Sequence, residues 1–343
     1  MLLEGLQLPL TTPFYPDGRL NLPKLEHNVA RYSKTPAAGL VALSDVGEPA
    51  MLSDDETRQA LRCVADAAAK EKVLVAGVSR DSVAGTLELA EAAAGFGYDA
   101  VLVKPPSLFR RDEIDERERE LLTYFQAVAD RSALPVVLEG GGLLPAAIVV
   151  ELAGHSRILG LVDDGAQDWV STLKSGTMGV QRDVTVTGVF AAVTRRMQTR
   201  GAEGGLVSAN TLTGGGAAAA VASAVKTRTK VVGFQMLSAT TAGMLEALQA
   251  GAVGVMPGFA AAAPQACYEV FAAWKDGDQG LAQEKQARLR HVAERVEERL
   301  GVAAIKFGCD LNGYFGGRPR LPQLPLTGEE RAEVESLMQG LRN

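Results

Sequence analysis

Three charged residues end short apolar runs of this sequence, and their types suit acid–base chemistry on a small molecule. They are Asp45, Lys104 and Glu139. A carboxyl group in apolar surroundings has a raised pKa and can exchange protons near neutral pH. A lysine close to it can supply a positive charge or a nucleophilic amine. We therefore predict that these three residues are catalytic.

A fourth run, 158–162, stops at Asp163 and Asp164. Its continuous apolar character is typical of a strand that is buried on both faces of a parallel sheet. Ligands of such folds bind outside the carboxyl ends of the strands. We expect a substrate to contact residues at or beside these strand ends, namely Ser44, Gly47, Glu48, Ser107, Gly140, Val162 and Asp164.

Eight runs of this kind alternate with segments in which apolar residues recur at helical spacing. The expected strands are 6–12, 39–44, 73–78, 100–104, 135–139, 158–162, 231–237 and 252–256, and the expected helices are 22–33, 54–69, 82–96, 112–130, 145–153 and 241–250. Eight strand–helix units without a linker predict a closed (β/α)₈ TIM barrel. We place the barrel at residues 1–262 and a C-terminal helical region at 263–343, with helices at 264–275, 280–300 and 329–341.

The stretch between the sixth and seventh runs is longer than one helix requires. We interpret residues from about 175 to 230 as an insertion after strand six that covers the barrel mouth or forms a subunit contact. Residues 183–193 are typical of a strand or hairpin, and an alternative register makes 184–189 the seventh strand. Gly214-Gly215-Gly216 suits a phosphate cradle or, more simply, a flexible loop.

The composition excludes several classes of partner. A net charge of −6 and a pI near 5.3 argue against nucleic acid and anionic membranes. No apolar span is long enough to cross a bilayer, and the N-terminus lacks the features of a signal peptide. Three widely spaced cysteines predict a reducing compartment, so we expect a cytoplasmic protein. The three histidines form no metal-binding pattern, and no cofactor is expected.

Several motifs together resemble one family. They are Thr11-Thr12-Pro13-Phe14 with Asp17-Gly18, Gly47-Glu48 with Leu52-Ser53-Asp54-Asp55-Glu56, Val75-Ala76-Gly77-Val78, Pro135-Val136-Val137-Leu138, Ala250-Gly251-Ala252-Val253-Gly254-Val255, and the stretch from Lys306 to Gly317-Arg318-Pro319. The chain resembles the dihydrodipicolinate synthase/N-acetylneuraminate lyase family over nearly its whole length. The resemblance implies a TIM barrel, a homo-oligomer (dimer or tetramer) and aldol chemistry on 2-oxo acids through an imine-forming lysine on strand six.

The polar residues of that chemistry are replaced here. The family pattern G-[IL]-K-D-S reads Gly160-Leu161-Val162-Asp163-Asp164, and valine cannot form an imine. The resemblance further implies that Glu139 replaces a proton-relaying tyrosine, that the carboxylate-binding arginine falls near Leu144, that Asp45-Val46 replace two threonines, and that Ser107-Leu108 replace two tyrosines. We therefore expect Schiff-base chemistry with pyruvate to be absent.

Two classes of function remain open. The first is a lyase or aldolase that acts on a small 2-oxo acid or sugar acid at a non-canonical site. Within it, Lys104 could be a relocated imine lysine with Glu139 as proton shuttle, or the two could form only an ion pair. A further alternative is that the carboxylates bind a divalent metal ion. In the simpler interpretation they lie at the rim of the barrel and bind no metal. The second class is a catalytically inactive homologue that binds a small molecule or a partner.

Overall fold

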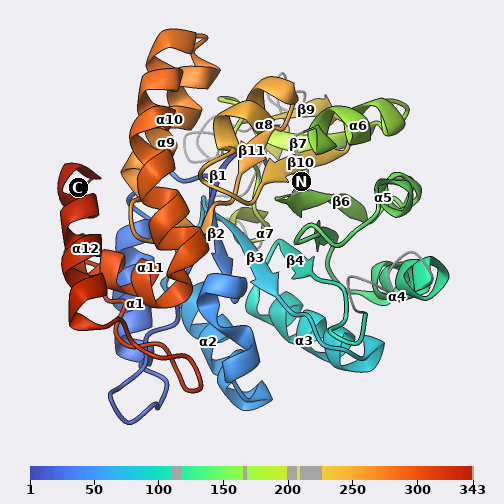
Figure 1. Ribbon diagram of the computed structural model, residues 1–343. Coiled ribbons are helices and arrows are strands. Elements are labelled where there is room, and N and C mark those ends of the chain that lie inside the picture. Colours follow the sequence, from blue (N-terminus) through green and yellow to red (C-terminus); the bar gives the residue numbers. More distant parts are fainter. Residues whose placement is uncertain (110–116, 165–167, 199–206, 209–225, 342–343) are drawn as a thin grey trace, which may run out of the picture.

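A closed barrel of eight parallel strands forms the centre of the molecule (Figure 1). The computed structural model describes residues 1–109, 117–164, 168–198, 207–208 and 226–341. The barrel strands are β1 (Gly5–Pro9), β2 (Gly39–Ala42), β3 (Val73–Gly77), β4 (Ala100–Val103), β5 (Val136–Glu139), β6 (Ile158–Asp163), β10 (Gln235–Ser238) and β11 (Gly254–Val255). Their order around the barrel is β1-β11-β10-β6-β5-β4-β3-β2. The predicted TIM barrel is confirmed.

Helices lie outside the barrel (Figure 1), and the first three of them begin at residues whose side chains cap them. They are α1 (Leu22–Tyr32), α2 (Asp54–Ala67), α3 (Val83–Phe96), α4 (Glu118–Arg131), α5 (Ala146–Ala153), α6 (Trp169–Gly176) and α8 (Met244–Ala250). At the start of α2, Ser53 Oγ accepts the Glu56 N–H and the Glu56 carboxylate accepts the Ser53 N–H. This capping box satisfies two N–H groups that the helix itself leaves without partners. The first part of the helix expected at 112–130 lies outside the described residues.

Strand residues alternate between two apolar cores, as a barrel covered by helices requires. Leu40 and Leu74 pack outward in the large core between strands and helices. Val41, Val75 and Val162 point the other way, into a smaller core that fills the barrel. Val162 therefore projects to the inside of the barrel from β6, next to the carboxyl end of the strand.

The seventh barrel strand is shorter than predicted. Residues 231–237 appear as one apolar run, but Val231 belongs to another sheet and the barrel strand begins at Gln235. That other sheet has three strands, β7 (Arg182–Thr187), β9 (Lys226–Val232) and β8 (Val207–Ser208). The alternative in which 184–189 forms the seventh barrel strand is wrong, because β7 pairs antiparallel with β9 instead.

The described part of the insertion, which also includes α7 (Arg195–Gln198), lies at the amino end of the barrel. Arg182 Nη2 donates to the Ala153 carbonyl at 2.6 Å, at the end of α5, and to the His155 carbonyl at 2.9 Å, in the loop that precedes β6. Arg196 Nη2 donates to the Lys72 carbonyl at 2.7 Å, directly before β3. These contacts are on the face opposite to the mouth, so this part of the insertion does not cover the mouth as one of our two interpretations expected. Gly214-Gly215-Gly216 lies outside the described residues.

After β11 the chain is helical. The elements are α9 (Pro264–Lys275), α10 (Gln279–Ala293), a π-helical segment (Glu294–Arg299), α11 (Gly301–Leu311) and α12 (Gly328–Met338). The helix predicted at 280–300 is therefore interrupted by π-helical hydrogen bonding, a feature that occurs often beside functional sites. Among the described helices, none combines the length and apolar character needed to cross a membrane.

Candidate active site

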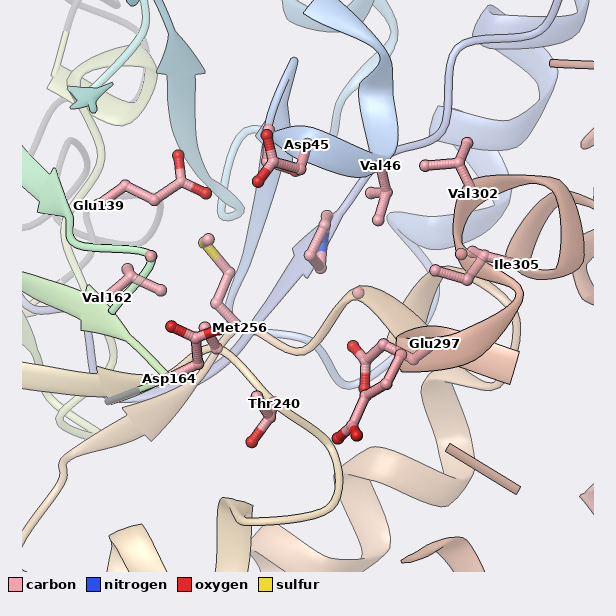
Figure 2. A pocket seen from close by; sticks show the side chains of 17 residues that line it. Asp45, Val46, Glu139, Val162, Asp164, Thr240, Met256, Glu297, Val302 and Ile305 are labelled. Atoms are coloured by element: carbon pink, nitrogen blue, oxygen red, sulfur yellow. The ribbon is translucent and has the colours of Figure 1, made fainter. Parts of the chain in front are cut away.

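A cavity of about 310 Å³ opens at the carboxyl ends of the barrel strands, where the active sites of TIM barrels lie (Figure 2). Strand ends, loops and the C-terminal helices all contribute to its walls. It is lined by Pro9, Ser44, Asp45, Val46, Glu139, Gly141, Val162, Asp164, Ala239, Thr240, Met256, Gly258, Glu297, Glu298, Gly301, Val302 and Ile305. Five of the predicted site residues, Ser44, Asp45, Glu139, Val162 and Asp164, are thus brought together.

Of the three predicted catalytic residues, Lys104 contacts the other two. The Lys104 ammonium contacts the Asp45 carboxylate and lies 3.7 Å from Glu139 Oε1. The Glu139 side chain is only 11% exposed, whereas that of Asp45 is 73% exposed. Burial raises the pKa of Glu139 to about 8, although the ammonium of Lys104 acts to lower it. Near neutral pH most of this carboxyl is therefore protonated, and Asp45 supplies the negative charge that balances Lys104.

The charge state of Lys104 follows from the same contacts. Burial alone would lower the pKa of Lys104, but the carboxylates of Glu139 and Asp45 outweigh that effect and raise the pKa above its ordinary value. Lys104 is therefore held as an ammonium ion. A protonated amine is a hydrogen-bond donor and a source of positive charge, but it is not a nucleophile.

Val162 stands next to Glu139 in the barrel wall. The two residues are direct partners in the β5–β6 register, and Val162 is also paired with Leu237 of β10. Its side chain faces the cavity near Met256 (Figure 2). Among the described residues that line the cavity there is no lysine or arginine.

The glycine turn after β5 is built around the Asp163 carboxylate. Asp163 Oδ1 accepts the N–H groups of Gly142 and Asp164, each at 2.8 Å. A Cβ atom on Gly140 would lie 2.6 Å from Asp163 Oδ2, so a larger residue cannot occupy position 140 without displacing this carboxylate. Burial raises the pKa of Asp163 to about 6, against the lowering effect of the two N–H donors. The structure thus places Gly140 against Asp163, whereas Gly141 and Asp164 border the cavity.

Three further predicted residues lie away from the cavity lining. Ser107 donates its N–H and hydroxyl to Asp81, both at 2.7 Å. The Gly47 carbonyl accepts the Thr12 hydroxyl at 2.6 Å, which fastens the loop after β2 to the loop after β1. Glu48 is completely buried and pairs with a lysine of the C-terminal region.

That lysine is Lys306 of α11, and its side chain, like that of Glu48, has no exposure to solvent. Lys306 Nζ also donates to the Arg318 carbonyl at 3.1 Å and lies 4.5 Å from the centre of the Phe14 ring. Glu48 Oε2 accepts the Arg320 N–H at 2.8 Å. Burial lowers the pKa of Lys306, and the Glu48 carboxylate opposes that effect. The pair fixes the C-terminal region to the loop that carries Asp45.

Glu297 lines the cavity but was not predicted from the sequence as a site residue. It belongs to the π-helical segment, and its Oε2 and Oε1 accept the N–H groups of Thr241 and Phe259, each at 3.0 Å. Thr241 follows β10 and Phe259 follows β11, so one carboxylate holds two loops of the mouth. A charged residue in a helical pattern gives no sequence signal for this role.

The carboxylates of the described residues do not form a metal-binding arrangement. Among the described residues, no three histidine, cysteine, aspartate or glutamate side chains are grouped so that they could hold a metal ion. Asp163 is occupied by backbone N–H groups and Asp45 by Lys104, which leaves few oxygen ligands directed at one point.

Comparison with known proteins identifies the relationship of this chain. A model of the dihydrodipicolinate synthetase family matches residues 2–219 and 206–341. The chain belongs to that family. The sequence resemblance at this coarse level is therefore confirmed, and the family suggests a lyase or aldolase.

Two relatives share about a quarter of their residues with this family member. The 4-hydroxy-tetrahydrodipicolinate synthase of Acidiphilium cryptum is 26% identical over 99% of both chains. The L-threo-3-deoxy-hexylosonate aldolase of Hypocrea jecorina is 28% identical over 98% of this chain and 95% of its own. These relatives are named for different reactions, so similarity at this level does not indicate a substrate.

Solved structures of the family have the same fold. The dihydrodipicolinate synthase of Bacillus anthracis superimposes with a TM-score of 0.76 at 19% identity, covering all of both chains. The chloride-inhibited dihydrodipicolinate synthase of Acinetobacter baumannii, complexed with pyruvate, has the same TM-score at 19% identity and covers 99% of this chain and 100% of its own.

Proposed function

We propose that this family member is a lyase or aldolase that acts on a small 2-oxo acid or sugar acid without forming an imine. The observation that carries the proposal is the buried Glu139 carboxyl, whose pKa is raised to about 8, beside the Lys104 ammonium at the edge of the cavity. A group with this pKa is a suitable general base or acid near neutral pH.

Glu139 and Lys104 can act together to break a bond next to a carbonyl group. Ionised Glu139 accepts a proton from the carbon beside the carbonyl, and the electrons of that bond move to the carbonyl oxygen. The Lys104 ammonium then stabilises the negative oxygen that forms. Protonated Glu139 returns its proton to the carbon, or to a leaving hydroxyl group, when the product forms.

The relocated imine is the weaker of the alternatives. An imine forms only from a neutral amine, whereas Glu139 and Asp45 keep Lys104 protonated. Val162, at the place where the family pattern has lysine, has no amine. A bound divalent metal also finds no group of ligands among the described residues. Acid–base chemistry by Glu139 and Lys104 is thus the mechanism that we favour.

Treatment with pyruvate and sodium borohydride should leave the mass of the protein unchanged, because no described lysine at the cavity is a free neutral amine. Intact-mass spectrometry measures the mass of the treated protein. A synthase of the family that has the imine-forming lysine on strand six serves as the positive control. A mass increase corresponding to one reduced pyruvate would contradict the proposal. Repeating the reaction with Lys104→Ala would then show whether Lys104 forms the imine.

Proton exchange at the carbon beside a carbonyl should become faster with increasing pH and reach half of its maximum near pH 8. The base must be ionised to act, and burial raises the pKa of Glu139 to about 8. Nuclear magnetic resonance can follow deuterium uptake into small oxo compounds in heavy water. A rate that stays flat from pH 6 to 9 would exclude Glu139 as the base.

A catalytically inactive, ligand-binding homologue is the second candidate. The observation in its favour is that Lys104 is already engaged by Asp45 and Glu139 within the protein. In that case ligands would bind to the cavity, yet neither deuterium exchange nor bond cleavage would exceed the rate without protein.

A further inference from the structure

The loop that follows β10 is held by two side chains of the C-terminal helical region. Glu297 Oε2, in the π-helical segment, accepts the Thr241 N–H at 3.0 Å. Gln286 of α10 donates from Nε2 to the carbonyls of Thr241 and Ala242 at 2.9 and 3.0 Å, and its Oε1 accepts the Leu245 N–H at 3.3 Å. The N–H and the carbonyl of Thr241 are thus both fixed by residues of these helices.

The same Glu297 carboxylate also contacts the loop that follows β11. Its Oε1 accepts the Phe259 N–H at 3.0 Å. A Cβ atom on the preceding residue, Gly258, would lie 3.0 Å from Glu297 Oε1 and 2.9 Å from Val46 Cγ1. Both distances are shorter than ordinary van der Waals contact, so only glycine fits between Glu297 and Val46 without displacing one of them.

Val46 connects this contact to the predicted catalytic residues. It belongs to the same short 3₁₀ turn, residues 45–47, as Asp45. The Asp45 carboxylate contacts the Lys104 ammonium, which lies 3.7 Å from Glu139 Oε1. A displacement of Val46 would therefore move the carboxylate that balances the charge of Lys104.

We propose that Glu297 is a positioning residue, which holds the loops after β10 and β11 and thereby keeps Asp45 beside Lys104. Glu297 lies on the side of the cavity opposite to Glu139 (Figure 2), so its effect on the acid–base pair passes through the loops. This inference rests on the proposed function, because it takes Glu139 and Lys104 as the reacting groups. The π-helical hydrogen bonding of the segment fits such a role, since it is frequent at functional sites.

Glu297→Gln should lower the rate of deuterium uptake into pyruvate at pH 8 by about tenfold, because the amide has one acceptor oxygen for two N–H donors. Gly258→Ala should have a similar effect, since the added Cβ displaces Val46 or Glu297. Glu294→Gln changes an exposed carboxylate of the same π-helical segment and is the matched control, which should keep the wild-type rate.

The pKa of Glu139 distinguishes positioning from a merely structural role. Lys104, Asp45 and Asp164 face this carboxyl; Lys104 lowers its pKa, whereas Asp45 and Asp164 raise it. If Asp45 leaves its place, one raising charge is removed and Lys104 is free to act on Glu139 alone. The pKa of Glu139 should therefore fall below its wild-type value in Glu297→Gln.

Carbon-13 nuclear magnetic resonance on the full chain measures this pKa, with the Glu139 carboxyl signal identified by its loss in Glu139→Gln. The measurement needs no substrate. The pKa should fall in Glu297→Gln and in Gly258→Ala and stay unchanged in Glu294→Gln. An unchanged pKa in both of the first two variants would overturn the inference.

The two measurements together separate this inference from the proposed function. A lower pKa of Glu139 in Glu297→Gln, with no deuterium uptake catalysed even by the wild type, would support the positioning role and contradict the lyase. Uptake by the wild type, with rate and pKa both unchanged in Glu297→Gln, would support the lyase and overturn the positioning role.

Discussion

Lys306→Met should lower the free energy of unfolding by about 3–5 kcal/mol, because it leaves Glu48 as a buried charge without its counter-charge. Both side chains of the pair are completely buried, so water cannot replace the missing ammonium. Denaturant unfolding, followed by circular dichroism at constant pH, measures the change. A loss well below this range would mean that Glu48 becomes hydrated or protonated when its partner is removed.

Two matched variants test the reason for this effect. Arg295→Met breaks the Arg295–Glu333 pair on the surface and should cause little change, because both groups remain in water. Combining Glu48→Gln with Lys306→Met should recover much of the stability lost in the single variant, since no buried charge remains. If the double variant were as unstable as Lys306→Met alone, packing rather than charge would explain the loss.

Glu139→Gln should reduce the rate of proton exchange by about 10²–10⁴-fold, since the amide keeps the shape of the side chain but cannot accept a proton. The measurement is deuterium uptake into the preferred oxo compound at pH 8. Glu151→Gln, remote from the cavity, serves as the control and should retain the full rate. Retention of the rate in Glu139→Gln would remove Glu139 from the mechanism.

The same substitution should make the protein more stable at alkaline pH. The pKa of Glu139 is about 8 in the folded protein against an ordinary value of 4.5, so folding favours the protonated form. The free energy of unfolding therefore decreases as the pH rises from about 4.5 to about 8, where the unfolded chain has already lost this proton. Glu139→Gln should abolish this decrease and gain a few kcal/mol at pH 8, with no gain below pH 4.

The barrel could be predicted from the sequence because its signals are local and repeated. Apolar runs such as that of β6 and capping boxes such as Ser53 with Glu56 are determined by neighbouring residues. The same logic placed Asp45, Lys104 and Glu139 at strand ends, and parallel strands bring their carboxyl ends to one face. The seventh strand was misplaced because residues 231–237, which are mostly apolar, continue from one sheet into another.

Contacts between residues that are distant in the sequence could not be predicted. Lys306 lies in α11, a helix that falls between the helices predicted at 280–300 and 329–341, and only the fold shows that it reaches Glu48. The link between Glu297 and the loops after β10 and β11 likewise depends on how the C-terminal helices pack on the barrel. The position of the described part of the insertion depends on Arg182 and Arg196 donating to carbonyl groups that precede other strands, which no periodic pattern reveals.

The contacts of Glu297 and Lys306 also have a consequence for the order in which the protein is completed during synthesis. All eight barrel strands have left the ribosome once Val255 has emerged. Two residues that complete the mouth are synthesised later. Glu297 holds Thr241 and Phe259, and Lys306 neutralises Glu48. Until the C-terminal helices pack on the newly made barrel, the loops after β10 and β11 are not yet held by Glu297, and Glu48 has no counter-charge. Translation that stops before α11 would release a chain with a complete set of strands and an unfinished active site.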